Sequence, residues 1–185
     1  LGLDQNEYVI LIDDDGDFTN GGTTIDSLEN SYDAINDIAI FDNKDLPDGA
    51  YFTIGFMPKT IISIADGLWS NPATWNCNCV PSTATNVIID ETHEVTVDIS
   101  AGCNNLDVTA TGSLIFTSGN DLVIMGDLES LGSLDGTDGI VNMAGTFDQD
   151  INVTTATFED FIMSNTDEVF MVSGAVVING SLTVT

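Results

Sequence analysis

Cationic side chains are almost absent from this sequence. Lys44 and Lys59 are the only two in 185 residues, against 30 carboxylates that are mostly aspartate, and the formal net charge is −28. Nucleic-acid binding needs Lys and Arg to displace phosphate counterions, and attachment to an anionic membrane surface needs a polybasic patch. The composition therefore excludes nucleic acids and anionic lipid surfaces as partners.

Long apolar runs are missing as well. No run approaches the roughly 18 residues of a membrane-spanning helix, so we expect no membrane insertion. The chain begins at Leu1 without a methionine and shows no signal-peptide pattern. We therefore expect it to be an internal or processed piece of something longer.

Helical periodicity is nearly absent too, and residues 27–38 are the one possible exception. Apolar residues make up 43% of the chain and recur along its whole length, which is typical of a folded protein and not of an acidic disordered tail. Short β-branched runs bounded by Gly, Asn and Asp predict strands at 8–12, 38–41, 51–56 and 61–64. The fold class is therefore all-β, and residues 1–65 are predicted to form an antiparallel β-sandwich-like segment.

From residue 66 the residue pattern of the sequence changes, and a Gly-x-Leu or Gly-x-Phe unit recurs. Leu114 and Leu134 lie 20 positions apart, and Leu128 and Phe147 lie 19 apart. A period of this length indicates a solenoid in which each turn consists of three short strands. Residues 66–185 are thus predicted to form a parallel β-helix (β-solenoid), with an interior that includes Leu114, Leu128, Leu134, Ile140, Phe147, Ile162 and Val177.

The two ends of such a solenoid need covering, because they expose strand edges and apolar side chains. Trp69 and Trp75 precede the first turn and are predicted to cap it. No matching cap follows, since residues 181–185 read as an unfinished strand. We expect neighbouring modules or identical subunits to continue end to end from Thr185.

Aspartates gather near the start of the chain. On an extended segment the side chains of Asp13, Asp15 and Asp17 point the same way and converge on one cation, with Gly16 easing the bend. Asp14 and Asn20 are further candidate ligands. A Ca²⁺ site and a solvated acidic turn are the two readings of this pattern, which departs from the EF-hand loop.

A second group of carboxylates is Asp135, Asp138, Asp148 and Asp150, predicted to lie in solenoid turns. They suit either another cation cluster or the carboxylate set of an inverting polysaccharide hydrolase. Neither lysine lies in the solenoid, which argues against a lyase, and His93 is assigned no role. The chain is therefore predicted not to be an enzyme.

A resemblance to a known class of proteins covers most of the chain. It rests on the segment Trp69-Ser70-Asn71-Pro72-Ala73-Thr74-Trp75 with Cys77, Val80-Pro81, Asn86 to Ile89 and Cys103 to Leu106, and on the upstream stretches 8–18 and 48–55. These resemble modular cell-surface, adhesin-like proteins of Bacteroidota that are cargo of type IX secretion. The resemblance implies an extracellular or cell-surface location, and Asp26-Ser27-Leu28 is similar to the O-glycosylation pattern of that group, with Ser27 as acceptor.

The same resemblance implies a disulfide between Cys77 and Cys103 and leaves the state of Cys79 open. The rival interpretation is a metal site formed by the three thiolates and His93, although Cys-x-Cys is not the usual zinc spacing.

The sequence thus favours a non-enzymatic extracellular structural module, a stalk, adhesin or filament segment stabilised by cations. Carbohydrate or ice recognition through a flat face is the alternative, which would make surface glycans partners. The threonines that favour it do not repeat at one turn spacing. A fragment of a β-helical hydrolase is the third interpretation.

Overall fold

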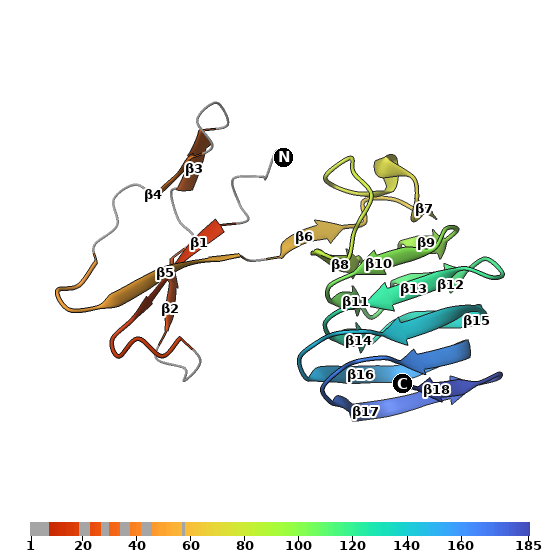
Figure 1. Ribbon diagram of the computed structural model, residues 1–185. Coiled ribbons are helices and arrows are strands. Elements are labelled where there is room, and N and C mark those ends of the chain that lie inside the picture. Colours follow the sequence, from red (N-terminus) through yellow and green to blue (C-terminus); the bar gives the residue numbers. More distant parts are fainter. Residues whose placement is uncertain (1–7, 19–22, 27–29, 34–37, 42–45, 57) are drawn as a thin grey trace. The chain divides into compact units, whose positions relative to one another are not determined.

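The computed structural model describes residues 8–18, 23–26, 30–33, 38–41, 46–56 and 58–185 (Figure 1). In these residues the protein is nearly all β, as predicted, and its only helical element is a single 3-10 turn. The chain forms two compact units, Leu1–Lys59 and Thr60–Thr185. The division thus falls between Lys59 and Thr60, whereas the sequence analysis placed it between residues 65 and 66.

The N-terminal unit contains short antiparallel strands. They are β1 (Tyr8–Asp13), β2 (Thr24–Asp26), β3 (Asn30–Asp33), β4 (Ile38–Phe41) and β5 (Tyr51–Phe56). One sheet has the order β2-β1-β5, and β3 pairs with β4 in a second, two-stranded sheet. Strand β3 lies within residues 27–38, so the helix considered there is not formed at residues 30–33.

The C-terminal unit is a parallel β-solenoid of about five turns, wound from strands that form three faces (Figure 1). Face A contains β6 (Lys59–Ile62), β8 (Thr85–Ile89), β11 (Leu106–Val108), β14 (Leu128–Ser130) and the first parts of β16 (Gln149–Met163) and β17 (Val169–Ile178). Face B contains β7 (Gly67–Leu68), β9 (Glu94–Val97), β12 (Ser113–Phe116), the start of β15 (Ser133–Met143), and later parts of β16 and β17. Face C contains β10 (Ala101–Cys103), β13 (Asp121–Ile124), the end of β15, the end of β16 and β18 (Leu182–Val184).

Apolar side chains stack in columns inside the solenoid, one residue per turn. On face B the inward column is Val95, Leu114, Leu134, Ala156 and Val176, so the predicted match of Leu114 with Leu134 is confirmed. Most of these side chains are fully buried and belong to one continuous core. Because each strand pairs with its equivalents in the turns before and after, the core runs along the axis and does not close into a globule.

The predicted interior is wrong at several positions, and Phe147 is the largest error. Leu128 pairs with Ile151 and not with Phe147, whose side chain is 80% exposed in a corner. The spacing of 19 was misleading because the corner from Ala144 to Asp148 is longer than the corners before it.

A change of alternation inside β15 explains the errors at Ile140 and Ile162. The register shifts between Gly136 and Ile140, so inward positions change from even to odd residue numbers. Val141 therefore fills the core, and Ile140 faces outward. Ile162 pairs with Asn142 beyond this change and also faces outward. Val177 faces outward because Val176 is the residue of β17 that pairs with the inward Ala156.

Glycine is required at the corner between faces A and B, where successive turns come close together. A Cβ atom on Gly132 would collide with the carbonyl oxygens of Thr109 and Gly112. A Cβ on Gly112 would lie 2.8 Å from the carbonyl oxygen of Ile89 in the preceding turn. The Gly-Ser-Leu units that begin at Gly112 and Gly132 both lie at this corner, whereas the unit that begins at Gly180 lies between faces B and C.

Candidate functional site

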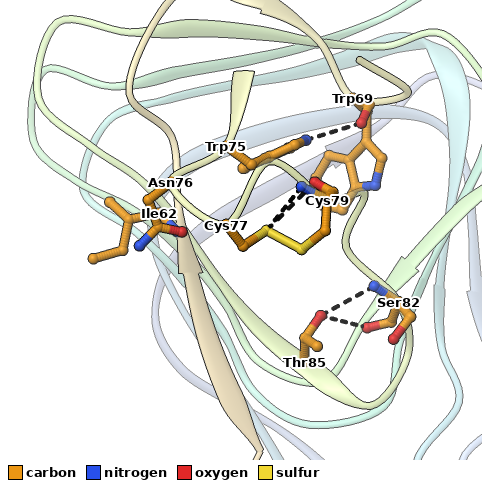
Figure 2. Close-up of a disulfide and its surroundings, with 8 residues drawn as sticks. All are labelled: Ile62, Trp69, Trp75, Asn76, Cys77, Cys79, Ser82 and Thr85. Carbon is orange, nitrogen blue, oxygen red and sulfur yellow. Dashed lines mark hydrogen bonds between the residues drawn. A yellow bond between two sulfur atoms is a disulfide. The ribbon is translucent and has the colours of Figure 1, made fainter. Parts of the chain in front are cut away.

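The N-terminal end of the solenoid is covered by the segment between β7 and β8. The 3-10 turn η1 (Pro72–Thr74) lies in this segment, and the side chain of Asn71 caps it by accepting a hydrogen bond from Ala73 N at 3.1 Å. Trp69 and Trp75 are both buried and pack edge to face, with ring centroids 5.1 Å apart. Trp75 Nε1 donates to the carbonyl oxygen of Trp69 at 2.9 Å (Figure 2). Both tryptophans therefore lie where the sequence analysis placed a cap.

Two further contacts fix this cap to the first turn. Trp69 N donates to the carbonyl oxygen of Thr96 at 2.8 Å, which joins the cap to face B. The Asp98 carboxylate accepts hydrogen bonds from Ser70 N at 3.0 Å and Ser70 Oγ at 2.6 Å. Partial burial raises the pKa of Asp98, but these hydrogen bonds outweigh it and leave the pKa below its usual value. Sequence reasoning missed this contact, because nothing in the pattern relates residue 70 to residue 98.

The disulfide joins Cys77 to Cys79 and not to Cys103, so the predicted pairing is wrong (Figure 2). Its Cα atoms are 5.1 Å apart, and only Asn78 lies between the two cysteines. Asn78 has φ 52°, a left-handed conformation that Asn tolerates better than most residues. In the chain-entropy model a loop this short stabilises a protein by only about 1–2 kcal/mol, against roughly 3–4 kcal/mol for a loop spanning residues 77–103.

Cys103 is a free thiol inside the solenoid. It begins the inward column of face C, which continues through Ile124, Met143, Met163 and Val184. Burial raises the pKa of its thiol, so the thiolate needed for metal binding is strongly disfavoured. With the other two cysteines oxidised, the alternative three-thiolate site with His93 does not form either. His93 Nδ1 instead lies 3.0 Å from Ser63 Oγ, which also accepts from Asp90 N.

Asp13 ends β1 and the chain bends over residues 14–16, so Asp13, Asp15 and Asp17 do not lie on one extended segment. Asp13 is buried, and its Oδ1 accepts hydrogen bonds from Asp15 N at 2.9 Å and Gly16 N at 2.7 Å. Asp17 N donates in the same way to Asp15 Oδ1. These carboxylates thus bond to the backbone of their own turn, as aspartates in turns commonly do.

Electrostatics at this turn follow from the same contacts. Burial disfavours the charge of Asp13, but hydrogen bonds from Asp15, Gly16 and Thr23 outweigh it, so the pKa of Asp13 is lowered. Asp14, Asp15 and Asp17 are exposed. Among the residues that the structure describes, no group of three or more acidic, His or Cys side chains is arranged to hold a metal ion. Asn20 and Ser27 lie outside the described residues, so calcium binding and glycosylation remain predictions.

Asp135, Asp138, Asp148 and Asp150 do not form one cluster. Asp135 lies on face B, between Ile115 and Thr157, and Asp138 follows at the corner between faces B and C; Asp135 Oδ1 accepts from Thr137 N. Asp148 and Asp150 lie at the corner between faces C and A. Asp150 N donates to Asp127 Oδ1 in the turn before, which continues a ladder in which Asp127 N donates to Asn105 Oδ1.

A shallow acidic hollow lies on the outer side of face A, over β8, β11 and β14. Asp107 and Glu129 are adjacent on neighbouring strands and line it together with Asp127, Asn86 and Asn105. Partial burial and the neighbouring Glu129 raise the pKa of Asp107. Like charges are thus stacked along this face with no cation among its lining residues.

The last turn of the solenoid exposes its apolar side chains. Met171, Leu182 and Val184 end the inward columns of faces A and C, yet they are 47%, 56% and 69% exposed. Strands β17 and β18 pair with β16 on one side, and no strand of the described residues pairs with their other side. We call this surface the terminal layer; it combines free backbone groups with an apolar surface.

Comparisons with known proteins found no match to a family model, to a curated protein or to a solved structure. In the described part of the chain, no helix has the length and apolar character needed to cross a membrane.

Proposed function

We propose that this chain is a non-enzymatic structural module of an extracellular or cell-surface protein, and that it serves as a stalk, adhesin or filament segment. The supporting observation is the polarity of the solenoid. One end is covered by Trp69 and Trp75, whereas the terminal layer presents unpaired strands and an exposed apolar surface. Such a surface favours the addition of another layer of strands.

The partner at the terminal layer is a neighbouring module or an identical subunit. Head-to-tail stacking of identical solenoids is disfavoured, because the tryptophan cap covers the end that would have to receive the terminal layer. Two identical chains can use the layer together only tail to tail, in a closed pair. Filament growth through this layer therefore needs a neighbouring module that supplies the next strands.

The many acidic side chains are compatible with a role as a structural module. A net charge of −28 keeps separate rods apart in solution, and cations weaken that repulsion. We include Ca²⁺ in the proposal as a stabilising ion, bound at the acidic faces or at the turn after β1.

Matched substitutions test the terminal layer. Leu182 and Leu131 are about equally exposed, at 56% and 54%, but Leu182 lies in the terminal layer and Leu131 lies at a corner. In sedimentation velocity with calcium present, we expect the native chain to form tail-to-tail pairs, Leu182→Asp to abolish them and Leu131→Asp to leave them intact. Equal behaviour of both variants, or a native chain that stays monomeric at all concentrations, would contradict a self-associating terminal layer.

Carbohydrate binding is the second candidate, and one hollow favours it. A depression of about 400 Å³ on face B is lined by the hydroxyl-bearing residues Ser133, Thr137, Thr154, Thr155 and Thr157, together with Asp135. Sugars are recognised by such convergent polar groups, although no aromatic ring lines this depression. A glycan panel tests this candidate, with Thr155→Val as the variant expected to weaken binding.

A further inference from the structure

The Cys77–Cys79 disulfide is not needed to shape the loop in which it lies. Asn76 N donates to the carbonyl oxygen of Ile62 at 2.9 Å, and Asn76 Oδ1 accepts from Ile62 N at 3.1 Å. Asn78 N donates to the carbonyl oxygen of Trp75 at 3.0 Å. These bonds hold the loop against β6 and the cap without any contribution from sulfur, so the folded loop is compatible with both the oxidised and the reduced pair.

The disulfide packs against the edge of the core and is only partly buried. Cys77 and Cys79 are half-buried, and the residues on either side of Cys79, Asn78 and Val80, are exposed. Cross-links that span few residues restrict the unfolded chain little, so a bond between residues two apart is poorly suited to a purely stabilising role. A disulfide that is not fully buried is open to attack by a thiolate.

The two sulfur atoms have different surroundings, which assigns them different roles. Cys79 N lies 3.2 Å from Cys77 Sγ and donates a hydrogen bond to it. A negative charge that develops on Cys77 Sγ is stabilised by this donor, because hydrogen bonds to ionised acceptors are stronger than those to neutral ones. Cys77 is therefore the better leaving group, and Cys79 Sγ is the atom to be attacked.

From this arrangement we propose that Cys77–Cys79 is a stoichiometric thiol–disulfide exchange site, at which one disulfide is consumed for each dithiol of a neutral or cationic peptide or protein that it oxidises. A substrate thiolate attacks Cys79 Sγ, the Cys77–Cys79 bond breaks, and Cys77 leaves as a thiolate that takes a proton from water. The second substrate thiolate then attacks the substrate sulfur of the mixed disulfide and releases Cys79. The substrate loses two electrons and gains a disulfide, and the Cys77–Cys79 pair is reduced to two thiols.

The rest of the molecule favours this chemistry in two ways. Cys103 is enclosed in the core and does not compete for the mixed disulfide. The charge of −28 repels anionic thiolates and attracts cationic ones, which sets the preferred class of substrate.

The test uses the full, folded chain and a reduced dithiol peptide of net positive charge. We expect two cysteines to become alkylated under native conditions, at Cys77 and Cys79, while Cys103 stays unmodified and the tryptophan fluorescence and thermal midpoint change little. At low salt, cysteamine should react about 10-fold faster than mercaptoethanesulfonate, and added salt should narrow the difference.

Fragment-ion mass spectrometry of the trapped cysteamine adduct locates the attacked sulfur, which we expect on Cys79. An adduct on Cys77 would overturn the assignment of roles. Reduction that occurs only in denaturant, or that shifts the tryptophan fluorescence as the solenoid unfolds, would overturn the proposal itself. The Cys77→Ser/Cys79→Ser double variant is the control, and it should fold with a native spectrum and show no exchange.

Discussion

Gln149 offers the sharpest test of the packing described above, because it is a polar side chain inside the core. It is 1% exposed and bridges three turns of the solenoid at the corner between faces C and A. Nε2 donates to the carbonyl oxygens of Ile124, at 3.1 Å, and Gly126, while Oε1 accepts from Gly145 N at 3.0 Å and Asn165 Nδ2 at 2.6 Å. Gln149→Leu keeps the approximate volume and removes all four hydrogen bonds.

The cost of this substitution follows from which groups keep another partner. Ile124 O still accepts from Ala144 N, and Asn165 Nδ2 still donates to Phe147 O. Gly145 N and Gly126 O lose the bonds they made to Gln149, and an unsatisfied buried group costs about 1–3 kcal/mol. Allowing for the apolar gain of Leu, we expect the free energy of unfolding to fall by about 2–4 kcal/mol. For a unit of this size the thermal midpoint should fall by roughly 8–16 °C.

Thermal and urea unfolding followed by far-ultraviolet circular dichroism measures this loss. Phe147→Ala is the matched control, since Phe147 lies in the same corner but is 80% exposed, and it should change stability by no more than about 0.5 kcal/mol. The reasoning is refuted if Gln149→Leu is neutral. It is also refuted if Phe147→Ala costs the roughly 3–5 kcal/mol of a core phenylalanine.

Three further predictions concern charge. Asp107→Asn should raise the free energy of unfolding at pH 7 by less than about 1 kcal/mol, because the raised pKa of Asp107 means that its charged form is disfavoured in the folded state. The gain should vanish below pH 3.8, where the carboxyl is protonated in both the folded and the unfolded state. Asp160→Asn should instead lower the free energy of unfolding at pH 7, because hydrogen bonds from Ser181 lower the pKa of Asp160 in the folded state. The stability that Asp160 contributes should be lost as the pH falls below 3.8. Unfolding of both variants measured as a function of pH distinguishes the two effects. Raising NaCl from about 0.01 to 0.15 M shortens the screening length from roughly 30 to 8 Å and should raise the thermal midpoint. A rise with CaCl₂ no larger than with NaCl at equal ionic strength would argue against the proposed calcium binding.

The fold was predictable because its signals are local. Short β-branched runs, glycine at the corners and a 20-residue spacing are all visible in one sequence, and the register of Ser113 with Ser133 follows from them. The register beyond Leu134 was not predictable, because two corners lengthen and one strand changes its alternation. Gln149 was missed for a related reason, since a hydropathy pattern gives no sign that a glutamine fills the core.

The cysteine pairing failed on a different point. The resemblance to other proteins supplied Cys77 and Cys103 as partners, but it gave no information on the direction in which their side chains point. Cys103 lies two residues from Ala101 on β10, and both pair with buried residues of β13, so alternation along this strand turns the thiol inward. At the turn after β1 the sequence could not show that Asp13 and Asp15 accept hydrogen bonds from the backbone of their own turn, and calcium binding there stays a prediction.

The covered end of the solenoid has a consequence for how the protein is made. The tryptophan cap is synthesised before the turns that rest on it, and each later turn contacts mainly the turn that precedes it in the chain. A growing polypeptide can therefore add folded turns in the order of translation, each on a turn that has already folded, without waiting for distant segments. Folding during synthesis thus proceeds from the tryptophan cap toward the terminal layer.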